Sequence, residues 1–427
     1  MLCHAELVAN FKKLLPDYTP EDAIGSPYAP IGYTCNPTLC PNGDSDLQWL
    51  REKLHSLGLL LMLDFVPNHS GCDSPWMDGD GINLYVRAPK GVSDPSKYMD
   101  NGVAYGNCPY SSPWTDVAQL NYWNPKLRAH MQEQLMHVAS LADGIRCDMA
   151  YIDLNQPFGE TWATELAAWG WSKPSTEFWG EAIKTVKSKY PSTIFLAEVY
   201  GDYYKTLQDL GFDYTYDKEY LDRLKSGNMD SIRSWLDQTS SRMKHMCYFT
   251  ENHDEDRALA VFGGDAQRTA GSAVMAMSLP GLRFYFEGQE LGLKNKLDVH
   301  LRRARAENGN DMLKVFYSNF TKIMSSDVMR NGVWNRVSLK GDESWKFVAW
   351  RYSLSSDNQA RVVVVNYGAE KASCQVVVPD VVGSGDVSIT ELFSGIVYKR
   401  SAPEMRSSGL TVVIDAHSAQ IFSYPRA

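Results

Sequence analysis

Hydrophobic positions along the chain alternate between two periods, and this alternation predicts repeated helix-then-strand units. In the first unit an amphipathic stretch at 46–57, with apolar residues at helical spacing, precedes the continuous apolar run 59–66. Gly58 separates the two, as a glycine at the end of a helix does. Continuous apolar runs are typical of strands that are buried on both faces. The pattern therefore predicts parallel strands covered by helices.

The same order recurs four more times. The predicted helix and strand pairs are 126–141 with 142–150, 177–190 with 193–200, 229–243 with 245–250, and 268–278 with 283–287. A shorter run at 212–216 is a sixth strand candidate. The fold class is thus α/β, and the strands suit either a (β/α)8 barrel or an open doubly wound sheet. No glycine-rich phosphate loop follows a strand, which removes the usual reason for a doubly wound nucleotide fold.

Two segments depart from the alternation. Residues 70–121 are rich in Gly, Pro, Asp, Ser and aromatic residues, and a loop-rich excursion of this length is usually functional. After about residue 340 the runs become short and β-branched, with Gly, Ser and Asn between them, as in an antiparallel β-sandwich. We therefore expect a barrel domain over 1–340, an inserted loop-rich subdomain over 70–121 and a β-sandwich domain over 341–427.

Composition narrows the possible partners. The 427 residues carry a formal charge of −9 and no basic block, so we expect no nucleic-acid partner. The N-terminus has no signal-peptide pattern, and no apolar run is long enough to cross a membrane. The 8 cysteines lack the paired spacing of a zinc site. We expect a cytoplasmic protein with free thiols, although disulfides remain possible if the protein is exported.

Carboxylates lie where three of the predicted strands end. Asp148, Glu198 and Asp254 each follow an apolar run, and two or three such groups are the apparatus for cleaving glycosidic bonds. In that reaction one carboxyl must be ionised and another protonated. Arg146 shares a strand face with Asp148 and would keep it ionised. A single Arg–Asp pair is more often a structural salt bridge, so the hypothesis depends on the groups occurring together.

Four motifs then resemble, in order and spacing, the α-amylase family of glycoside hydrolases (family 13). They are Asp64-Phe-Val-Pro-Asn-His69, Gly144-Ile-Arg-Cys-Asp148, Glu198-Val199 and Phe249-Thr-Glu-Asn-His-Asp254. The resemblance begins at about residue 26 and extends to the C-terminus. It implies a (β/α)8 barrel with Asp148 as nucleophile, Glu198 as general acid and base, and Asp254 as a group that stabilises the transition state.

The resemblance also implies substrate-binding residues and a reaction. His69 and His253 would donate hydrogen bonds to sugar hydroxyls, Tyr28 would stack on the same sugar, and Arg146 would support the nucleophile. The implied function is a retaining glycoside hydrolase that acts on α-glucosidic bonds of α-glucans or malto-oligosaccharides through a covalent glycosyl-enzyme intermediate. An α-glucan transglycosylase and a non-catalytic, amylase-like glycan-binding or partner protein are the alternatives.

Two departures from the family pattern modify this expectation. Gln119 stands where the family has a calcium-binding aspartate, and Asn68 alone matches a calcium ligand. Calcium takes six to eight oxygens, so we expect no cofactor and no firmly bound calcium. In addition, the family has two strands and a helix before the segment that starts near residue 26, whereas residues 1–25 offer only a helix-like stretch at 6–15. We therefore expect an atypical member, truncated at the N-terminus, whose barrel lacks the first two strands.

Overall fold

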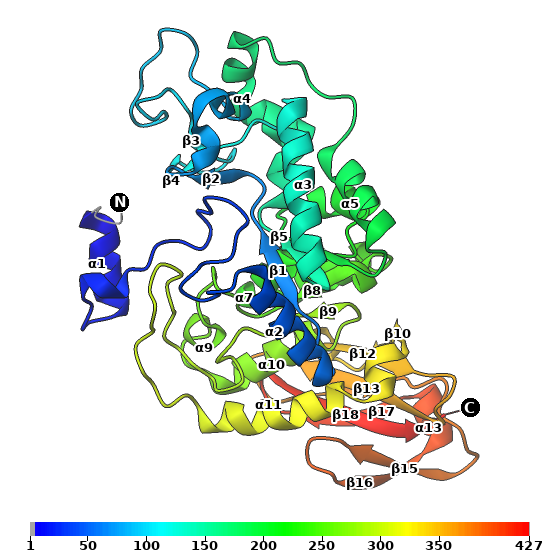
Figure 1. Ribbon diagram of the computed structural model, residues 1–427. Coiled ribbons are helices and arrows are strands. Elements are labelled where there is room, and N and C mark those ends of the chain that lie inside the picture. Colours follow the sequence, from blue (N-terminus) through cyan, green and yellow to red (C-terminus); the bar gives the residue numbers. More distant parts are fainter. Residues whose placement is uncertain (1–4, 427) are drawn as a thin grey trace. The chain divides into compact units, whose positions relative to one another are not determined.

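The computed structural model describes residues 5–426 (Figure 1). The chain divides into two compact units. The first consists mainly of Thr19–Tyr216, and the second consists mainly of Asp217–Asp298 and the residues from 303 on. Each unit is described separately below.

The first unit contains a parallel sheet with the strand order β1-β5-β6-β7. These strands are β1 (Met62–Phe65), β5 (Gly144–Cys147), β6 (Ile194–Ala197) and β7 (Tyr214–Tyr216). All four residues of β5 are buried, as expected for a strand covered on both faces. The predicted strands at 59–66, 142–150, 193–200 and 212–216 are confirmed, although each observed strand is shorter than its apolar run.

Helices α1 (Ala5–Leu14), α2 (Asp44–Ser56), α3 (Pro125–Leu141), α4 (Asn155–Ala168), α5 (Phe178–Lys189) and α6 (Tyr203–Asp209) occur in this part of the chain. The sequence pattern predicts α1, α2, α3 and α5, at 6–15, 46–57, 126–141 and 177–190. Helix α4 was not predicted, because it has Pro157 and Gly159 near its start and is kinked at Trp162, so its helical period is interrupted.

Within 70–121, the predicted excursion forms a small antiparallel sheet of its own. Strands β2 (His69–Gly71), β4 (Trp114–Gln119) and β3 (Tyr105–Gly106) lie in the order β2-β4-β3. The short 3-10 helices Pro75–Met77 and Gly79–Leu84 lie between β2 and β3. The register of the sheet pairs His69 with Gln119.

The second unit begins with helices and a pair of parallel strands. Its elements before the sandwich are α7 (Lys218–Ser226), α8 (Met229–Gln238), β8 (Met246–Tyr248), α9 (Ala258–Val261), α10 (Ala266–Met277), β9 (Leu282–Arg283), α11 (Asp311–Met324) and α12 (Asp327–Asn331). Strands β8 and β9 pair in parallel. Both predicted strands, at 245–250 and 283–287, are therefore present, with β9 reduced to two residues.

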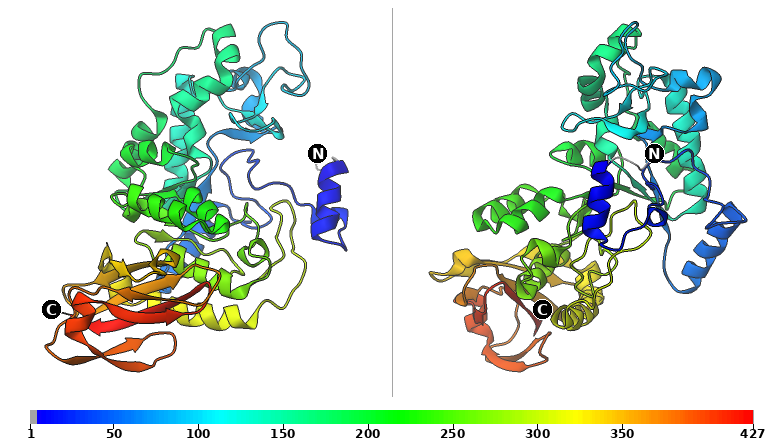
Figure 2. Two further views of the ribbon diagram at one scale, coloured as in Figure 1. Left: turned by 180° about the vertical axis from the view of Figure 1, so that it is seen from behind. Right: turned by 90° about the vertical axis from the view of Figure 1, so that its left-hand side faces the viewer.

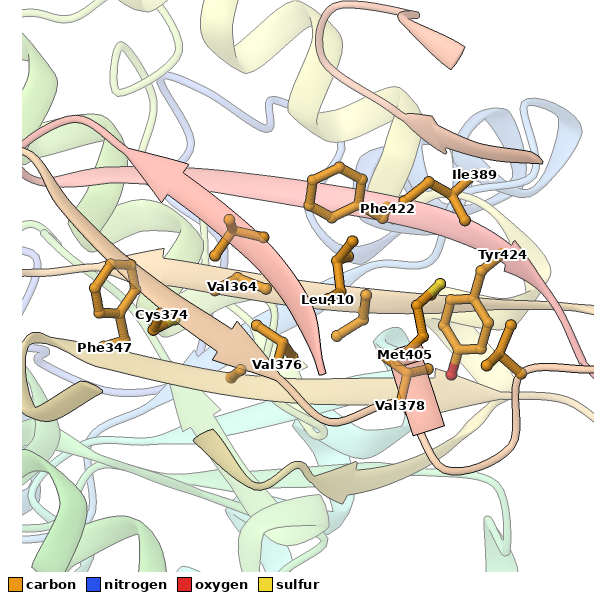
Figure 3. Close-up of a cluster of buried hydrophobic side chains, with 14 of the residues drawn as sticks. Phe347, Val364, Cys374, Val376, Val378, Ile389, Met405, Leu410, Phe422 and Tyr424 are labelled. Carbon is orange, nitrogen blue, oxygen red and sulfur yellow. The ribbon is translucent and has the colours of Figure 1, made fainter. Parts of the chain in front are cut away.

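The C-terminal segment folds as the predicted antiparallel β-sandwich, coloured orange to red in Figure 2. One sheet has the order β10-β12-β13-β18-β15-β16 and the other has the order β11-β14-β17. The strands are β10 (Val333–Arg336), β11 (Leu339–Lys340), β12 (Phe347–Ser353), β13 (Gln359–Asn366), β14 (Ala372–Val376), β15 (Asp386–Glu391), β16 (Val397–Ser401), β17 (Leu410–Ile414) and β18 (Ser418–Pro425), with helix α13 (Ala402–Ser407). Figure 3 shows the apolar core between them, with Phe347 and Val364 from one sheet and Val376 and Leu410 from the other.

The fold class is therefore α/β, and the order of strands and helices is that of a (β/α)8 barrel followed by a β-sandwich. Six parallel strands of barrel type occur within residues 5–426, four in the first unit and two in the second. Between residue 5 and β1 the described chain has no strand, as predicted, and Ala23 forms only an isolated bridge with Leu301. No helix among the described residues is long and apolar enough to cross a membrane. The seven described cysteines are unpaired, and Cys3 lies outside the described residues.

Candidate active site

The C-terminal ends of the neighbouring strands β5 and β6 bring Arg146, Asp148 and Glu198 together. One terminal nitrogen of the Arg146 guanidinium donates to Asp148 Oδ1 at 2.8 Å, and the other donates to Glu198 Oε2 at 2.6 Å. Asp148 and Glu198 are 7% and 2% exposed. Because a single guanidinium binds both carboxylates, the two lie side by side in a nearly dry site.

The backbone holds these two carboxylates in register. Beyond the strands, the amide of Asp148 donates to the carbonyl of Phe65, and the amide of Glu198 donates to the carbonyl of Cys147. The interstrand hydrogen-bond ladder therefore continues one residue past the end of β5 and one past the end of β6. Such extension fixes the positions of both side chains without a flexible loop.

Glu198 receives two further hydrogen bonds. The amide of Met149 donates to Glu198 Oε2 at 3.0 Å, and the hydroxyl of Tyr200 donates to Glu198 Oε1 at 2.8 Å. Met149 has a left-handed backbone, with φ 44° and ψ 34°. That conformation is unfavourable for a residue with a side chain, and here it turns the amide of Met149 towards Glu198.

The electrostatics of this cluster are dominated by burial. Burial and the neighbouring Glu198 raise the pKa of Asp148 well above its ordinary value, and Arg146 opposes the rise. Burial lowers the pKa of Arg146, but the adjacent Glu198, Tyr216, Asp64 and Asp148 raise it by more. Arg146 is therefore charged. We expected Arg146 to keep Asp148 ionised, but burial has a larger effect on the pKa of Asp148 than Arg146 has.

Asp64 and Tyr28 extend the cluster towards solvent. A terminal nitrogen of Arg146 also donates to Asp64 Oδ1 at 2.9 Å, and the hydroxyl of Tyr28 donates to Asp64 Oδ2 at 3.2 Å. The Arg146 guanidinium lies 5.5 Å from the centre of the Tyr28 ring. The structure thus places the predicted stacking residue Tyr28 beside the carboxylates, and its contact with a sugar stays a prediction.

His69 is buried and both of its ring nitrogens have partners. Nε2 donates to the carbonyl of Tyr28 at 2.8 Å, and Nδ1 accepts from the side-chain amide (Nδ2) of Asn68 at 3.1 Å. Burial lowers the pKa of His69, and the Tyr28 carbonyl opposes this effect. For His69 to donate to a sugar hydroxyl as predicted, its Nε2 would have to give up the hydrogen bond to the carbonyl of Tyr28.

The residues at the family's calcium position do not fit a calcium ion. The side-chain amide of Gln119 donates to Asn68 Oδ1 at 2.8 Å, and that of Asn68 donates back to Gln119 Oε1 at 3.3 Å. Each amide oxygen is thus occupied by the partner's N–H. No cluster of three or more His, Cys, Asp or Glu suited to a metal occurs in the described part of the chain. That no calcium binds firmly stays a prediction.

The remaining predicted residues, His253 and Asp254, lie in the second unit after β8. His253 Nε2 lies 3.1 Å from Asp254 Oδ2. The side chain of Asn252 accepts hydrogen bonds from the amides of Asp254 and Glu255, which fixes the turn. The Asp254 side chain is 47% exposed and therefore accessible to a ligand.

Sequence reasoning missed three residues of the cluster. Asp64 is the first residue of the motif that ends at His69, and it fits the alternation of side chains along its strand. Tyr200 lies two residues after Glu198. Spacing could therefore have indicated both residues. Asp153 gave no such signal. It is 1% exposed, and neither of its carboxylate oxygens has a hydrogen-bond partner among residues 5–426. Burial and the nearby Asp148 raise the pKa of Asp153 well above its ordinary value.

A parallel α/β barrel that gathers buried carboxylates at its strand ends has the architecture of glycoside hydrolases. Comparison with known proteins defines the family. The model of the α-amylase catalytic domain matches residues 110–361, which is more than half of the chain. The chain therefore belongs to the α-amylase family, as the motifs suggested.

Individual relatives are distant. The chain is 24% identical over 345 residues to α-amylase MalA of Haloarcula japonica, covering 76% of this chain and 45% of that protein. It is 23% identical over 301 residues to the probable oligo-1,6-glucosidase 2 of Bacillus subtilis, covering 58% and 53%. The chain spans about half the length of these relatives.

A solved structure supports the fold. The maltogenic α-amylase AmyB of Thermotoga neapolitana superposes with a TM-score of 0.69 at 18% identity, and the match covers 94% of this chain and 86% of that one. At this identity the similarity establishes the architecture.

Proposed function

We propose that this protein is a retaining glycoside hydrolase that cleaves α-glucosidic bonds of malto-oligosaccharides or α-glucans. The observation that carries the proposal is the single guanidinium of Arg146 that binds both Asp148 and Glu198 at adjacent strand ends. Retaining chemistry needs two carboxyls about 5–5.5 Å apart, with one protonated and the other ionised. Neighbouring parallel strands are a direct way to place two such groups.

In the first step a carboxylate oxygen of Asp148 attacks the anomeric carbon, and the bond from that carbon to the glycosidic oxygen breaks. Glu198 gives its proton to the departing oxygen. In the second step a water molecule attacks the anomeric carbon and transfers a proton to Glu198, and Asp148 leaves as a carboxylate.

The electrostatics of Asp148 set a condition on this division of labour. Burial and the neighbouring Glu198 raise the pKa of Asp148, whereas the first step needs this carboxyl to be ionised. Arg146 acts in the opposite direction, because its positive charge favours the carboxylate form of Asp148. When a sugar enters, the proton must reside on Glu198 for the first step, and Arg146 then supports the Asp148 carboxylate.

Short α-glucans are the proposed substrate class. The side-chain amides of Asn68 and Gln119 bond to each other at the position of the family's calcium ligands, and they brace the segment next to Tyr28 through His69. Relatives named as oligo-1,6-glucosidases and α-glucosidases occur beside the α-amylases. Transfer of the glucosyl group to a second sugar instead of to water would use the same intermediate.

The test compares the protein with its Asp148→Asn variant on an aryl α-glucoside and on malto-oligosaccharides. We expect turnover by the protein and a loss of about a thousandfold or more in the variant, because the nucleophile is removed. NMR of the first product should show the α-anomer. A β-anomeric product would refute the retaining mechanism. A folded protein that is no faster than Asp148→Asn on every substrate would refute the enzymatic function.

A further inference from the structure

The second unit contains an open groove of about 650 Å³ that shares no residue with the candidate active site. It is lined by the side of helix α8, the turn between β10 and β11, and the segment that leads into β12. Cavities of roughly 300–1,000 Å³ are typical of sites for small organic ligands. The groove is therefore large enough for a ligand of one or two rings.

The floor of the groove carries an exposed indole. Trp345 is 59% exposed, and its N–H has no hydrogen-bond partner among the described residues. The ammonium of Lys346 lies 5.5 Å from the centre of the Trp345 ring. The exposed indole offers a large flat apolar face with one polar edge, a shape on which the apolar face of a ligand ring can stack.

The backbone under this indole is rigidly held. One terminal nitrogen of Arg233, on α8, donates to the carbonyls of Ser344 and Phe347 at 2.9 and 2.8 Å, and it also donates to the carbonyl of Trp345. Carbonyls of the single 3-10 turn Ser344–Lys346 and of Phe347, the residue after it, thus converge on one guanidinium nitrogen. A platform fixed in this way loses little conformational freedom when a ligand binds.

Polar groups surround the indole. Arg336 forms an ion pair with Asp237, whose side chain is 68% exposed, and Ser338 lies on the same wall. Arg233 donates to carbonyls and Arg336 pairs with Asp237, so both guanidinium groups that line the groove already have partners. A neutral ligand with one apolar face and a rim of hydroxyls complements such a surface, and a hexopyranose ring has both features.

We propose that this groove is a second glucan-binding site, in which a glucose unit of an α-glucan stacks on Trp345 while Asp237, Arg336 and Ser338 hydrogen-bond to its hydroxyls. The choice of an α-glucan rests on the proposed function. The site retains the polysaccharide on the protein and takes no part in bond cleavage.

The experiment measures the retardation of the protein in native gels that contain amylopectin. An Asp148→Asn background prevents digestion of the glucan. Adding Trp345→Ala should weaken binding about tenfold, since one aromatic stacking contact contributes roughly 1.4 kcal/mol. Trp345→Tyr keeps a stacking ring and should retain most of the retardation. The matched control is Trp49→Ala on α2, because Trp49 is 65% exposed and lies outside the groove.

Equal retardation of the Trp345→Ala and parent proteins would overturn the proposal, and so would an equal loss in Trp49→Ala. In the active protein, Trp345→Ala should raise the KM for amylopectin and leave kcat/KM on an aryl α-glucoside unchanged. Loss of aryl glucosidase activity in a folded Trp345→Ala variant would also contradict the proposal. Retardation that depends on Trp345 in a protein without turnover would refute the proposed function and support the groove. Turnover in a protein whose retardation does not depend on Trp345 would support the proposed function and refute the second glucan-binding site.

Discussion

Replacement of Arg146 by methionine is the most informative perturbation of the candidate site. Methionine has a similar length but no charge. The variant would leave Asp64, Asp148 and Glu198 without the guanidinium that now donates to all three at 2.6–2.9 Å. Asp148 and Glu198 are almost completely buried, so water cannot take the place of the lost donors.

The expected loss in the free energy of unfolding at pH 7 is about 3–5 kcal/mol, the usual effect of removing one partner from a buried ion pair. Three hydrogen bonds to charged groups, at about 1.5–3 kcal/mol each, would add up to more. Asp148 limits the loss by taking up a proton. Without Arg146 the pKa of Asp148 would rise further, so the folded variant would bind protons that the unfolded chain has released. The loss should therefore be full at pH 7 and shrink towards pH 4, where the unfolded carboxyls also become protonated.

Urea unfolding followed by tryptophan fluorescence at pH 4 and pH 7 measures both quantities. The control is Lys205→Gln, which removes the exposed pair between Lys205 and Asp202 and should change stability by about 0–1 kcal/mol at either pH. A loss in the free energy of unfolding below about 1 kcal/mol for Arg146→Met at pH 7 would show that Arg146 does not stabilise the buried carboxylates. A loss that does not depend on pH would show the same.

Three further predictions concern the surroundings of this cluster. Tyr200→Phe removes one hydrogen bond to Glu198 and should lower kcat/KM on an aryl α-glucoside about tenfold or more, with the far-ultraviolet spectrum unchanged; an unaltered rate would exclude a positioning role. Asp153 has a raised pKa in the folded state, so its ionisation should favour the unfolded chain as pH rises above about 4. The stability of Asp153→Asn relative to the parent should therefore improve between pH 4 and pH 7, and a constant difference would mean that Asp153 is charged and paired. Because the amides of Asn68 and Gln119 are bonded to each other, dialysis against EDTA should leave activity and thermal midpoint unchanged, and a loss restored by Ca²⁺ would contradict that interpretation.

The parallel strands and the sandwich were predictable because burial determines their sequence pattern. Strand β5 reads as an unbroken apolar run apart from Arg146, and β13 reads as Val362 to Val365 without interruption. The carboxylates at strand ends were equally predictable, because the active sites of this fold lie at the C-terminal ends of its strands. Interrupted elements were harder to predict. Helix α4 lacks a clear helical period because of Pro157, Gly159 and the kink at Trp162, and β9 was predicted but has only two residues.

The electrostatics could not be derived from spacing. The alternation along β5 indicates that Arg146 and Asp148 share a face, but it does not show how deeply both are buried. Burial therefore reverses the expected direction of the pKa of Asp148. The unpartnered carboxyl of Asp153 depends in the same way on the depth of the turn after β5, which no local pattern encodes.

The left-handed backbone of Met149 sets a limit on how this protein can be stabilised. A non-glycine residue in that conformation costs roughly 1–3 kcal/mol, so Met149→Gly relieves strain and is an obvious choice for thermostabilisation. The same conformation directs the amide of Met149 to Glu198, and glycine would let the peptide rotate away. Selection for heat resistance at this position would therefore work against selection for turnover, and variants improved in one property should be sought elsewhere in the chain.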